Sequence, residues 1–435
     1  MRKRISHIVL AMCLLLAGSG TAWAAGFNIY EAGARATALG CAFTATADDG
    51  SALFYNAAGL SFMTGHKVEL NVMPIGPRFR FTEAERAAGD VATGEAADKL
   101  YISPGVYFTH NPGGRIAYGV GAYAPFGLGV EWLNANEWIG RQISYDVGIE
   151  TIYITPAASF LITDELAFAV GLDVAFQHLK LQKMTLHPTE GVNALDTTIE
   201  GTSDLNVTPS LGLMYRPAPE LSFGIMYHHK KTLKFRDQDA TLNNMIPAGG
   251  VGADWPATLL AGLGGSDQKV GADFKIPYIL AFGISYRFSE RFRGEADLVH
   301  FGWEHFDQLN LDFATDALDQ TIHFDYENTW QYRFGVEYVA MPEQLTLMAG
   351  YVRDKTPQPL KSVSPLLPDS DRNDYSIGAQ YKHGQWEFTL SYMAVISEER
   401  TNISGGLPAN PDEAYPVGTY KSLANIYGLG VGYNF

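Results

Sequence analysis

The chain has 435 residues and a formal net charge of −16, so it lacks the basic surface that nucleic-acid-binding proteins need. It contains only two cysteines, Cys13 and Cys41, and no cysteine spacing typical of a zinc site. Its length allows two or three soluble domains or one large barrel.

Residues 1–24 have the pattern of a secretory signal peptide. Three basic residues precede the apolar run "IVLAMCLLLAG", and Ala22-Trp23-Ala24 supplies an A-x-A cleavage site. The alternative is a transmembrane anchor, but the apolar run is shorter than the roughly 20 residues that a spanning helix needs. We therefore predict an exported protein whose mature chain starts at residue 25.

Residues 25–66 do not alternate and are rich in Ala and Gly. The segment is too apolar for a disordered tail, and a large barrel has an interior that such a segment can fill. We predict that residues 25–66 form a plug, or hatch, inside a barrel. The alternative is a periplasmic tail.

From residue 67 onward, large apolar residues alternate with small or polar residues, as in "PYILAFGISYRF" and "WEFTLSYMAVI". This period of two places the apolar side chains on one face of a β-strand. The stretches reach about ten residues, as tilted transmembrane strands do, whereas a soluble β-sandwich has strands of about 5–6 residues. We expect strands near residues 67–81, 100–110, 115–125, 141–162, 165–185, 203–216, 221–236, 272–288, 291–306, 321–340, 343–356, 372–383, 385–398 and 418–435.

The connections between these strands are alternately short and long. Tight turns such as "NPGG" and "KHGQ" alternate with long polar or Gly/Pro-rich loops such as residues 186–202 and 237–271. Outer-membrane barrels have short periplasmic turns and extended outer loops, and a sandwich has no reason to separate loops in this way. The sequence therefore predicts an all-β fold, in which residues 67–435 form an antiparallel transmembrane β-barrel of about 14 strands in a bacterial outer membrane.

The closing stretch "IYGLGVGYNF" is itself an alternating strand. In a closed barrel the last strand pairs with the first, so there is no free sheet edge that polar residues must protect from pairing with another chain. Its apolar face, which includes Tyr433 and Phe435, would point at lipid. A terminal Phe on such a strand resembles the signal by which the barrel assembly machinery recognises bacterial outer-membrane proteins.

Several stretches, taken as a set, resemble the FadL/TodX family of outer-membrane transporters for long-chain fatty acids and other hydrophobic compounds. They are "AGFNIYE", "GARATALG", "ATADDGSALFYNAAGL", "YAPFGLGVEW", "AFGISYRF", "FGWEHF", "NTWQYRFGVEY", "LMAGYVRDKTP" and "LPDSDRNDYSIGAQY", in order over nearly the whole mature chain. The resemblance implies a barrel with an N-terminal hatch. It also implies that ligand is collected among the outer loops, held in a lumenal pocket and released sideways through a kinked strand.

The resemblance places these functions on particular residues of this chain. The hatch motif falls on Asn56, Ala57, Ala58 and Gly59, with Ala57 where the family has Pro, which would make the turn less rigid. The kinked strand falls on residues 115–125, where Gly119, Gly121 and Pro125 are most able to interrupt a ladder. The outer-loop hydrophobic groove would draw on Met245, Ile246, Trp255, Leu259, Leu260 and Leu263.

Recognition of a ligand carboxylate is left open. The positions that hold basic residues in fatty-acid members fall here on Leu161 and Glu327. Arg333, which alternation turns inward, could supply the missing charge. The alternative is that Arg333 is a structural partner of lumenal acids such as Glu337.

No enzyme, metal or cofactor motif is found. His228 and His229 are neighbours on an expected strand, so they point to opposite faces and cannot bind one ion together. Neither G-x-S-x-G nor HExxH occurs, which makes a barrel hydrolase the weaker alternative. A general aqueous porin is the stronger one, although it would need an open lumen. We expect a passive, hatch-gated transporter whose partners are hydrophobic small molecules, outer-membrane lipid and lipopolysaccharide.

Overall fold

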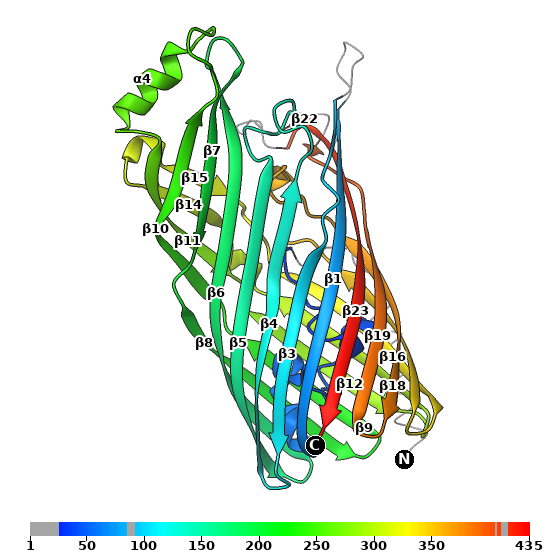
Figure 1. Ribbon diagram of the computed structural model, residues 1–435. Coiled ribbons are helices and arrows are strands. Elements are labelled where there is room, and N and C mark those ends of the chain that lie inside the picture. The colour runs from blue at the N-terminus through cyan, green and yellow to red at the C-terminus, as the bar shows by residue number, and fades with distance from the viewer. Residues whose placement is uncertain (1–25, 85–91, 405–406, 410–415) are drawn as a thin grey trace.

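The computed structural model describes residues 26–84, 92–404, 407–409 and 416–435. The predicted signal peptide, residues 1–24, lies outside the described residues. The remaining chain forms a tall β-barrel (Figure 1).

The barrel is closed and antiparallel, and strands that follow one another in the sequence lie side by side in the barrel wall. The last strand pairs with the first, so that Asn434 lies opposite Lys67. Nine wall strands are continuous: β1 (Gly65–Glu83), β3 (Tyr101–Asn111), β4 (Ile116–Glu131), β5 (Asp146–Thr163), β6 (Leu166–Leu186), β17 (Leu345–Asp354), β18 (Arg372–His383), β19 (Trp386–Ser397) and β23 (Gly418–Asn434).

The other wall strands are each divided into two segments by a short irregularity. One break falls at Pro277, which has no N–H to donate to a ladder. The segment pairs are β7 (Asn193–Thr202) with β8 (Asn206–Ala218), β9 (Leu221–His228) with β10 (Lys231–Asn244), β11 (Asp267–Ile276) with β12 (Ile279–Arg287), β13 (Phe292–Phe301) with β14 (Gln308–Phe313), and β15 (Gln320–His323) with β16 (Thr329–Met341). The described wall therefore has 14 strands, which confirms the predicted fold.

The closing strand shows how the alternation is used. Tyr427 and Leu429 are 51% and 48% exposed on the outer face, where the membrane would lie. Gly428 and Gly430 face inward, and a Cβ atom on Gly430 would lie 3.1 Å from the Cβ atom of Ala34. The apolar set therefore covers the outside, and the small set leaves room for chain inside the barrel.

Two of the predicted loops at the outer end of the barrel are wrong. Residues 193–202, expected in a loop, form β7, whose backbone pairs with β6 and β10. The loop expected at 237–271 is shorter, because β10 continues to Asn244 and β11 begins at Asp267. These outer strand ends have no lipid-facing surface that requires apolar residues, so the alternation signal fades although the ladder continues. β6 has 21 residues, twice the roughly 9–11 that a transmembrane strand needs.

Residues 26–62, called the N-terminal segment from here on, run through the interior of the barrel (Figure 1). The segment contains three short helices, α2 (Ala34–Ala38), α3 (Ala52–Tyr55) and the 3-10 helix η1 (Ala57–Phe62). Its small and aromatic side chains form the centre of the buried core.

Two short strands extend the wall sheet, β2 (Thr93–Glu95), which pairs with β1, and β20 (Arg400–Thr401), which pairs with β23. The remaining elements are α4 (Asp254–Gly262), η2 (Trp303–His305), η3 (Asp316–Leu318), η4 (Leu360–Ser362) and the separate pair β21 (Ile403–Ser404) and β22 (Leu407–Pro408). In the described part of the chain, no helix is both long and apolar enough to cross a membrane.

Candidate ligand cavity and lateral opening

Carboxylates of the barrel wall hold the backbone of the N-terminal segment. One Asp297 oxygen accepts hydrogen bonds from the N–H groups of Phe43 and Thr44, each at 2.9 Å. A Glu295 oxygen accepts from the N–H of Ala45 at 2.7 Å. This stretch lies between helices and would otherwise leave buried donors unpaired, so the two acids position it against β13.

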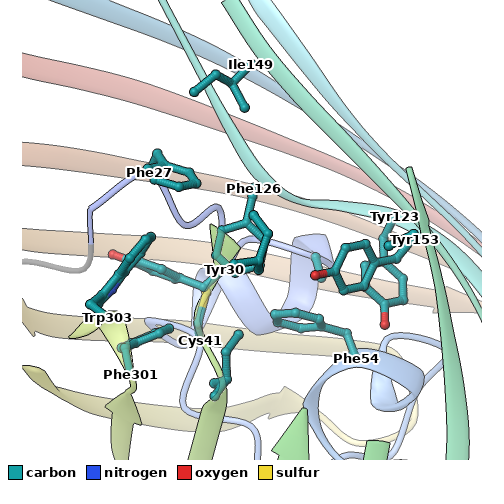
Figure 2. Packing of buried hydrophobic residues seen from close by; sticks show 14 of the residues in the cluster. Phe27, Tyr30, Cys41, Phe54, Tyr123, Phe126, Ile149, Tyr153, Phe301 and Trp303 are labelled. Atoms are coloured by element: carbon teal, nitrogen blue, oxygen red, sulfur yellow. The ribbon is translucent and has the colours of Figure 1, made fainter. Parts of the chain in front are cut away.

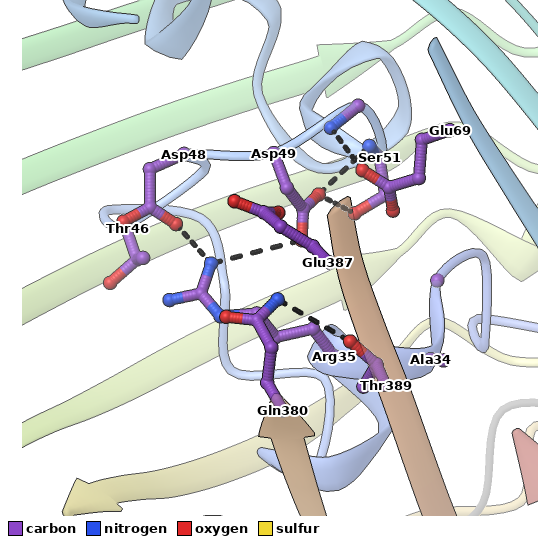
Figure 3. Close-up of polar contacts among 12 residues, drawn as sticks. Ala34, Arg35, Thr46, Asp48, Asp49, Ser51, Glu69, Gln380, Glu387 and Thr389 are labelled. Carbon is purple, nitrogen blue, oxygen red and sulfur yellow. Dashed lines mark hydrogen bonds and ion pairs between the residues drawn. The ribbon is translucent and has the colours of Figure 1, made fainter. Parts of the chain in front are cut away.

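Ion pairs within the segment, together with a hydrogen bond to β1, form a second set of polar contacts (Figure 3). The Arg35 guanidinium contacts Asp48 and lies 3.7 Å from Asp49. Asp49 accepts from the Ser51 hydroxyl at 2.6 Å, and the N–H of Gly50 donates to Glu69 of β1 at 2.9 Å. Burial and the nearby Glu69 carboxylate together raise the pKa of the Asp49 carboxyl to about 7.

The predicted hatch motif lies near the end of the segment, at the start of η1. The Asn56 side-chain amide donates to the carbonyl oxygens of Thr44 at 2.9 Å and of Leu213, on β8, at 3.0 Å. Its side-chain oxygen accepts from the N–H of Ala58 at 3.2 Å and so caps η1 without the proline that Ala57 replaces. A Cβ atom on Gly59 would lie 2.0 Å from the carbonyl oxygen of Ala47, so the close packing here requires glycine.

An aromatic cluster surrounds the start of the segment (Figure 2). The ring of Phe27 lies 4.8 Å from that of Trp303 and 5.9 Å from that of Phe126, both edge to face. Phe126 belongs to β4, so this cluster joins the N-terminal segment to the wall at one particular strand.

At that strand the wall ladder is incomplete. The pairing of β3 with β4 ends where Gly105 lies opposite Tyr123, and residues 101–104 of β3 have no described partner on β4. Beyond the gap, contact resumes where the N–H of Ala97 donates to the Glu131 carbonyl at 2.7 Å. The register of β4 with β5 also shifts between Tyr123 and Phe126. A gap bounded at both ends therefore exists in the wall between β3 and β4, called the β3–β4 opening below.

The N-terminal segment takes the place of the missing ladder on the β4 side. The N–H of Ile29 donates to the Pro125 carbonyl at 2.8 Å, and the N–H of Gly127 donates to the Phe27 carbonyl at 3.1 Å. The Asn28 side chain donates to the same Pro125 oxygen at 2.8 Å. Residues 27–29 thus lie directly behind the opening.

A cavity of about 400 Å³ occupies this place, between the N-terminal segment and the β3–β4 opening. Its inner wall includes the buried Phe27, Phe126 and Val395. Its outer wall includes Ile102, which is 54% exposed on the outer face of the barrel. The cavity is apolar for the most part and extends from the interior to the lipid-facing surface.

The kink predicted at Gly119 and Gly121 is wrong. Both residues have regular ladder partners on β3 and on β5. A Cβ atom on Gly119 would lie 2.7 Å from the Phe108 carbonyl oxygen, and one on Gly121 would lie 3.3 Å from the Cβ atom of Leu53. These glycines make room for the N-terminal segment, and the irregularity of β4 lies beside Pro125.

Arg333 does not line the cavity, and its possible role as a ligand charge stays a prediction. It is 3% exposed, and it donates to the carbonyl oxygen of Cys41 at 3.1 Å and to the side chain of Gln331. The alternative, that Arg333 is a structural partner of Glu337, is not found among the described residues. Glu337 pairs with Arg35 and Arg293.

The six predicted groove residues lie on α4 and on its flanks at the outer end of the barrel. Ile246 is buried, and the ring of Trp255 lies 5.3 Å from that of His187. None of the six lines the cavity at the β3–β4 opening.

The two histidines are separated as expected. His228 is 4% exposed and faces inward, with its Nδ1 atom 2.7 Å from Asp173, whereas His229 contacts the Tyr227 hydroxyl on the other face of the strand. Within the described ranges, no group of three or more His, Cys, Asp or Glu side chains is arranged to hold a metal ion.

Sequence reasoning missed the buried or half-buried charged residues of the cavity, Glu31, Asp369 and Arg372, and missed Tyr101, whose ring packs over Gly129 across the opening. Three of these lie in quoted stretches: "AGFNIYE" contains Glu31, and "LPDSDRNDYSIGAQY" contains Asp369 and Arg372. The resemblance of those stretches to the family could have pointed to these residues, but no sequence pattern indicates that the stretches lie together in the fold.

A closed 14-strand barrel with an apolar lateral cavity and chain through its lumen defines an outer-membrane transporter rather than an enzyme. The chain belongs to the family described as outer membrane protein transport protein (OMPP1/FadL/TodX), whose model matches residues 15–435. This confirms the family resemblance seen in the sequence.

Curated relatives of similar length are distant in sequence. Outer membrane protein P1 of Haemophilus influenzae is 22% identical, and the match covers 100% of both chains. The long-chain fatty acid transport protein of Escherichia coli is 19% identical over 89% of this chain and 91% of its own.

Solved structures share the fold. A Pseudomonas aeruginosa FadL homologue superposes with a TM-score of 0.79 at 20% identity, covering 94% of this chain and 100% of its own. The Pseudomonas putida toluene transporter TodX superposes with a TM-score of 0.68 at 17% identity, covering 94% of this chain and 98% of its own.

Proposed function

We propose that this protein moves hydrophobic small molecules passively across the outer membrane, through the cavity and then sideways between β3 and β4. One observation carries the proposal: a single cavity is lined both by buried Phe126 and by outward-facing Ile102, at the place where the wall ladder is missing. Burial of a ligand there gains about 25 cal/mol for each Å² of apolar surface.

The class of ligand is proposed from the cavity and from the relatives together. The Escherichia coli relative is named for long-chain fatty acid transport, and the Pseudomonas putida structure is named as a toluene transporter. A mostly apolar cavity of about 400 Å³ suits a fatty chain, an alkane or an aromatic hydrocarbon.

Residues 25–66 act in this proposal as the hatch. Residues 27–29 bind the edge of β4 at Pro125 and Gly127, so the start of the segment must move before the opening is free. The half-buried apolar residues on and beside α4 would collect ligand within the lipopolysaccharide layer. Tyr433 and Phe435, at the end of the closing strand, would serve recognition by the barrel assembly machinery.

A bulky side chain in the opening tests the lateral route. Gly127 lines the cavity, and a Cβ atom there would meet the flexible end of Ile29 at 2.8 Å, so Gly127→Phe would fill the space. A control is Gly148→Phe on β5, where the nearest neighbour of a new Cβ atom is 3.9 Å away.

Uptake of labelled oleate, toluene and an alkane is measured in a deletion strain that carries each variant. We expect Gly127→Phe to abolish uptake although the barrel assembles, and Gly148→Phe to preserve it. Normal uptake by an assembled Gly127→Phe barrel would overturn the lateral route. Large, steady ion conductance of the native protein in planar bilayers would favour an aqueous porin instead.

A further inference from the structure

The cavity at the β3–β4 opening contains more acidic than basic groups. Its ionisable lining residues are Glu31, Glu150, Asp369 and Arg372. Glu150 is exposed, so the charge that a ligand meets deep in the cavity is set by the other three.

Arg372 is the single basic residue among them, and acidic side chains of the barrel wall already compensate its charge. Its Nη2 atom lies 2.6 Å and its Nε atom 2.8 Å from the same oxygen of Asp354, which is fully buried. A second buried acid, Asp374, lies 3.9 Å from Nε. A ligand carboxylate would therefore compete with two fixed carboxylates for this guanidinium.

Glu31 is in the opposite situation. It lies in the N-terminal segment, lines the cavity and is 4% exposed. The carboxylate accepts a hydrogen bond from the backbone N–H of Glu31 itself. Among the described residues, no basic side chain forms an ion pair with it, and no other residue donates a hydrogen bond to it. Arg333, the other nearby base, is engaged by the Cys41 carbonyl and by Gln331. A carboxylate has about four acceptor sites, so one backbone donor leaves most of them unused, and a ligand that donates a hydrogen bond supplies a second donor.

We propose that Glu31 determines specificity, so that among hydrophobic molecules with a polar head the cavity prefers those whose head donates a hydrogen bond and carries no negative charge. Alcohols, phenols and amines meet this description, and carboxylates do not. Two negative charges close together in an apolar site repel strongly, whereas an O–H or N–H head gives Glu31 a donor besides its own backbone N–H. This inference rests on the proposed function, because it describes the ligand of the same cavity.

Three probes of equal chain length test the proposal: 1-decanol, decylamine and decanoate. Their binding to the purified full-length barrel is measured by calorimetry at pH 8, for the native protein, for Glu31→Gln and for the control Glu165→Gln. Glu165 lies exposed in the short turn between β5 and β6, far from the cavity lining.

We expect the native protein to bind decanol and decylamine at least about tenfold more tightly than decanoate. Glu31→Gln should reduce this ratio to within about threefold, because the amide keeps the shape and removes the charge. Glu165→Gln should leave the ratio unchanged.

Preferential binding of decanoate by the native protein would overturn the inference and leave the proposed function standing. An unchanged ratio in an assembled Glu31→Gln barrel would also overturn it. The native ratio decides the question even where that variant fails to assemble. Absence of binding by all three probes would overturn the inference and the proposed function together.

Discussion

The Nε2 atom of His228 lies 2.9 Å from the carbonyl oxygen of Phe54, which joins the barrel wall to the last turn of α3 in the N-terminal segment. The other ring nitrogen, Nδ1, lies 2.7 Å from the buried carboxylate of Asp173. Both partners are acceptors, so both ring nitrogens donate when Asp173 is ionised. The two rings, of His228 and Phe54, also stack at 5.7 Å. His228 is therefore a direct attachment between the wall and the N-terminal segment.

We expect His228→Leu to loosen the hatch. The substitution removes two hydrogen bonds, one of them charge-assisted, and such bonds contribute about 1.5–3 kcal/mol. Planar-bilayer recordings should then show ion conductance above that of the native protein. His229→Leu is the matched control, since His229 contacts only the outer face. Equal conductance of His228→Leu and native barrels would contradict the attachment.

Asp297 offers a second test of how the hatch is held. Asp297→Ala leaves the buried N–H groups of Phe43 and Thr44 without an acceptor, at a cost of about 1–3 kcal/mol each. We expect faster cleavage of the N-terminal segment by an added protease, while the barrel itself stays resistant. Asp312→Ala, at an exposed position on β14, should have no effect. Unchanged cleavage would show that Glu295 and the ion pairs suffice.

The wall and the cavity differ in how far the sequence reveals them. Alternation in residues 427–435 and the short turns predict the barrel, because lipid imposes a period of two on each strand. β7 was missed because its Thr and Asp residues face no lipid. The partner of Arg333 was missed because the Cys41 carbonyl is 292 residues away in the chain. Local pattern carries no information on which groups such a distant segment brings together.

The glycines of β4 show the same limit at a finer scale. Glycine weakens a strand in general, but whether it bends the strand depends on its neighbours. Gly119 and Gly121 keep their ladder partners because the N-terminal segment packs against them, and the ladder is interrupted at Pro125 instead.

We therefore expect Gly119→Val with Gly121→Val to impair assembly. The added side chains would overlap the Phe108 carbonyl and Tyr107 and would displace Leu53, and such overpacking costs about 1–3 kcal/mol. The fraction of folded barrel, measured by heat-dependent migration on gels, should fall relative to Gly148→Val. A double variant that assembles fully but takes up no ligand would support a hinge at these glycines after all.

The last prediction concerns pH, through the group that faces the ligand. Burial raises the pKa of the Glu31 carboxyl to about 7. The charged or titratable groups around it are Tyr30 and Cys41 of the N-terminal segment, Arg333 of β16, Asp354 of β17, and Arg372 and Asp374 of β18. Asp369 shares the cavity, and burial raises the pKa of its carboxyl to about 6.

The direction of the effect follows from which form of Glu31 is present. Below pH 7 the carboxyl is largely protonated, so it is neutral and can itself donate to an anion. Above pH 7 it is charged and repels one. Decanoate stays ionised throughout, since ordinary carboxyls have a pKa of about 4. The affinity of decanoate relative to decanol should therefore fall as the pH rises from 6 to 8, with a midpoint near 7. Glu31→Gln should flatten this profile, whereas Asp369→Asn should keep the step. A step that persists in Glu31→Gln would assign the titration to another group and remove Glu31 from the recognition of the ligand head.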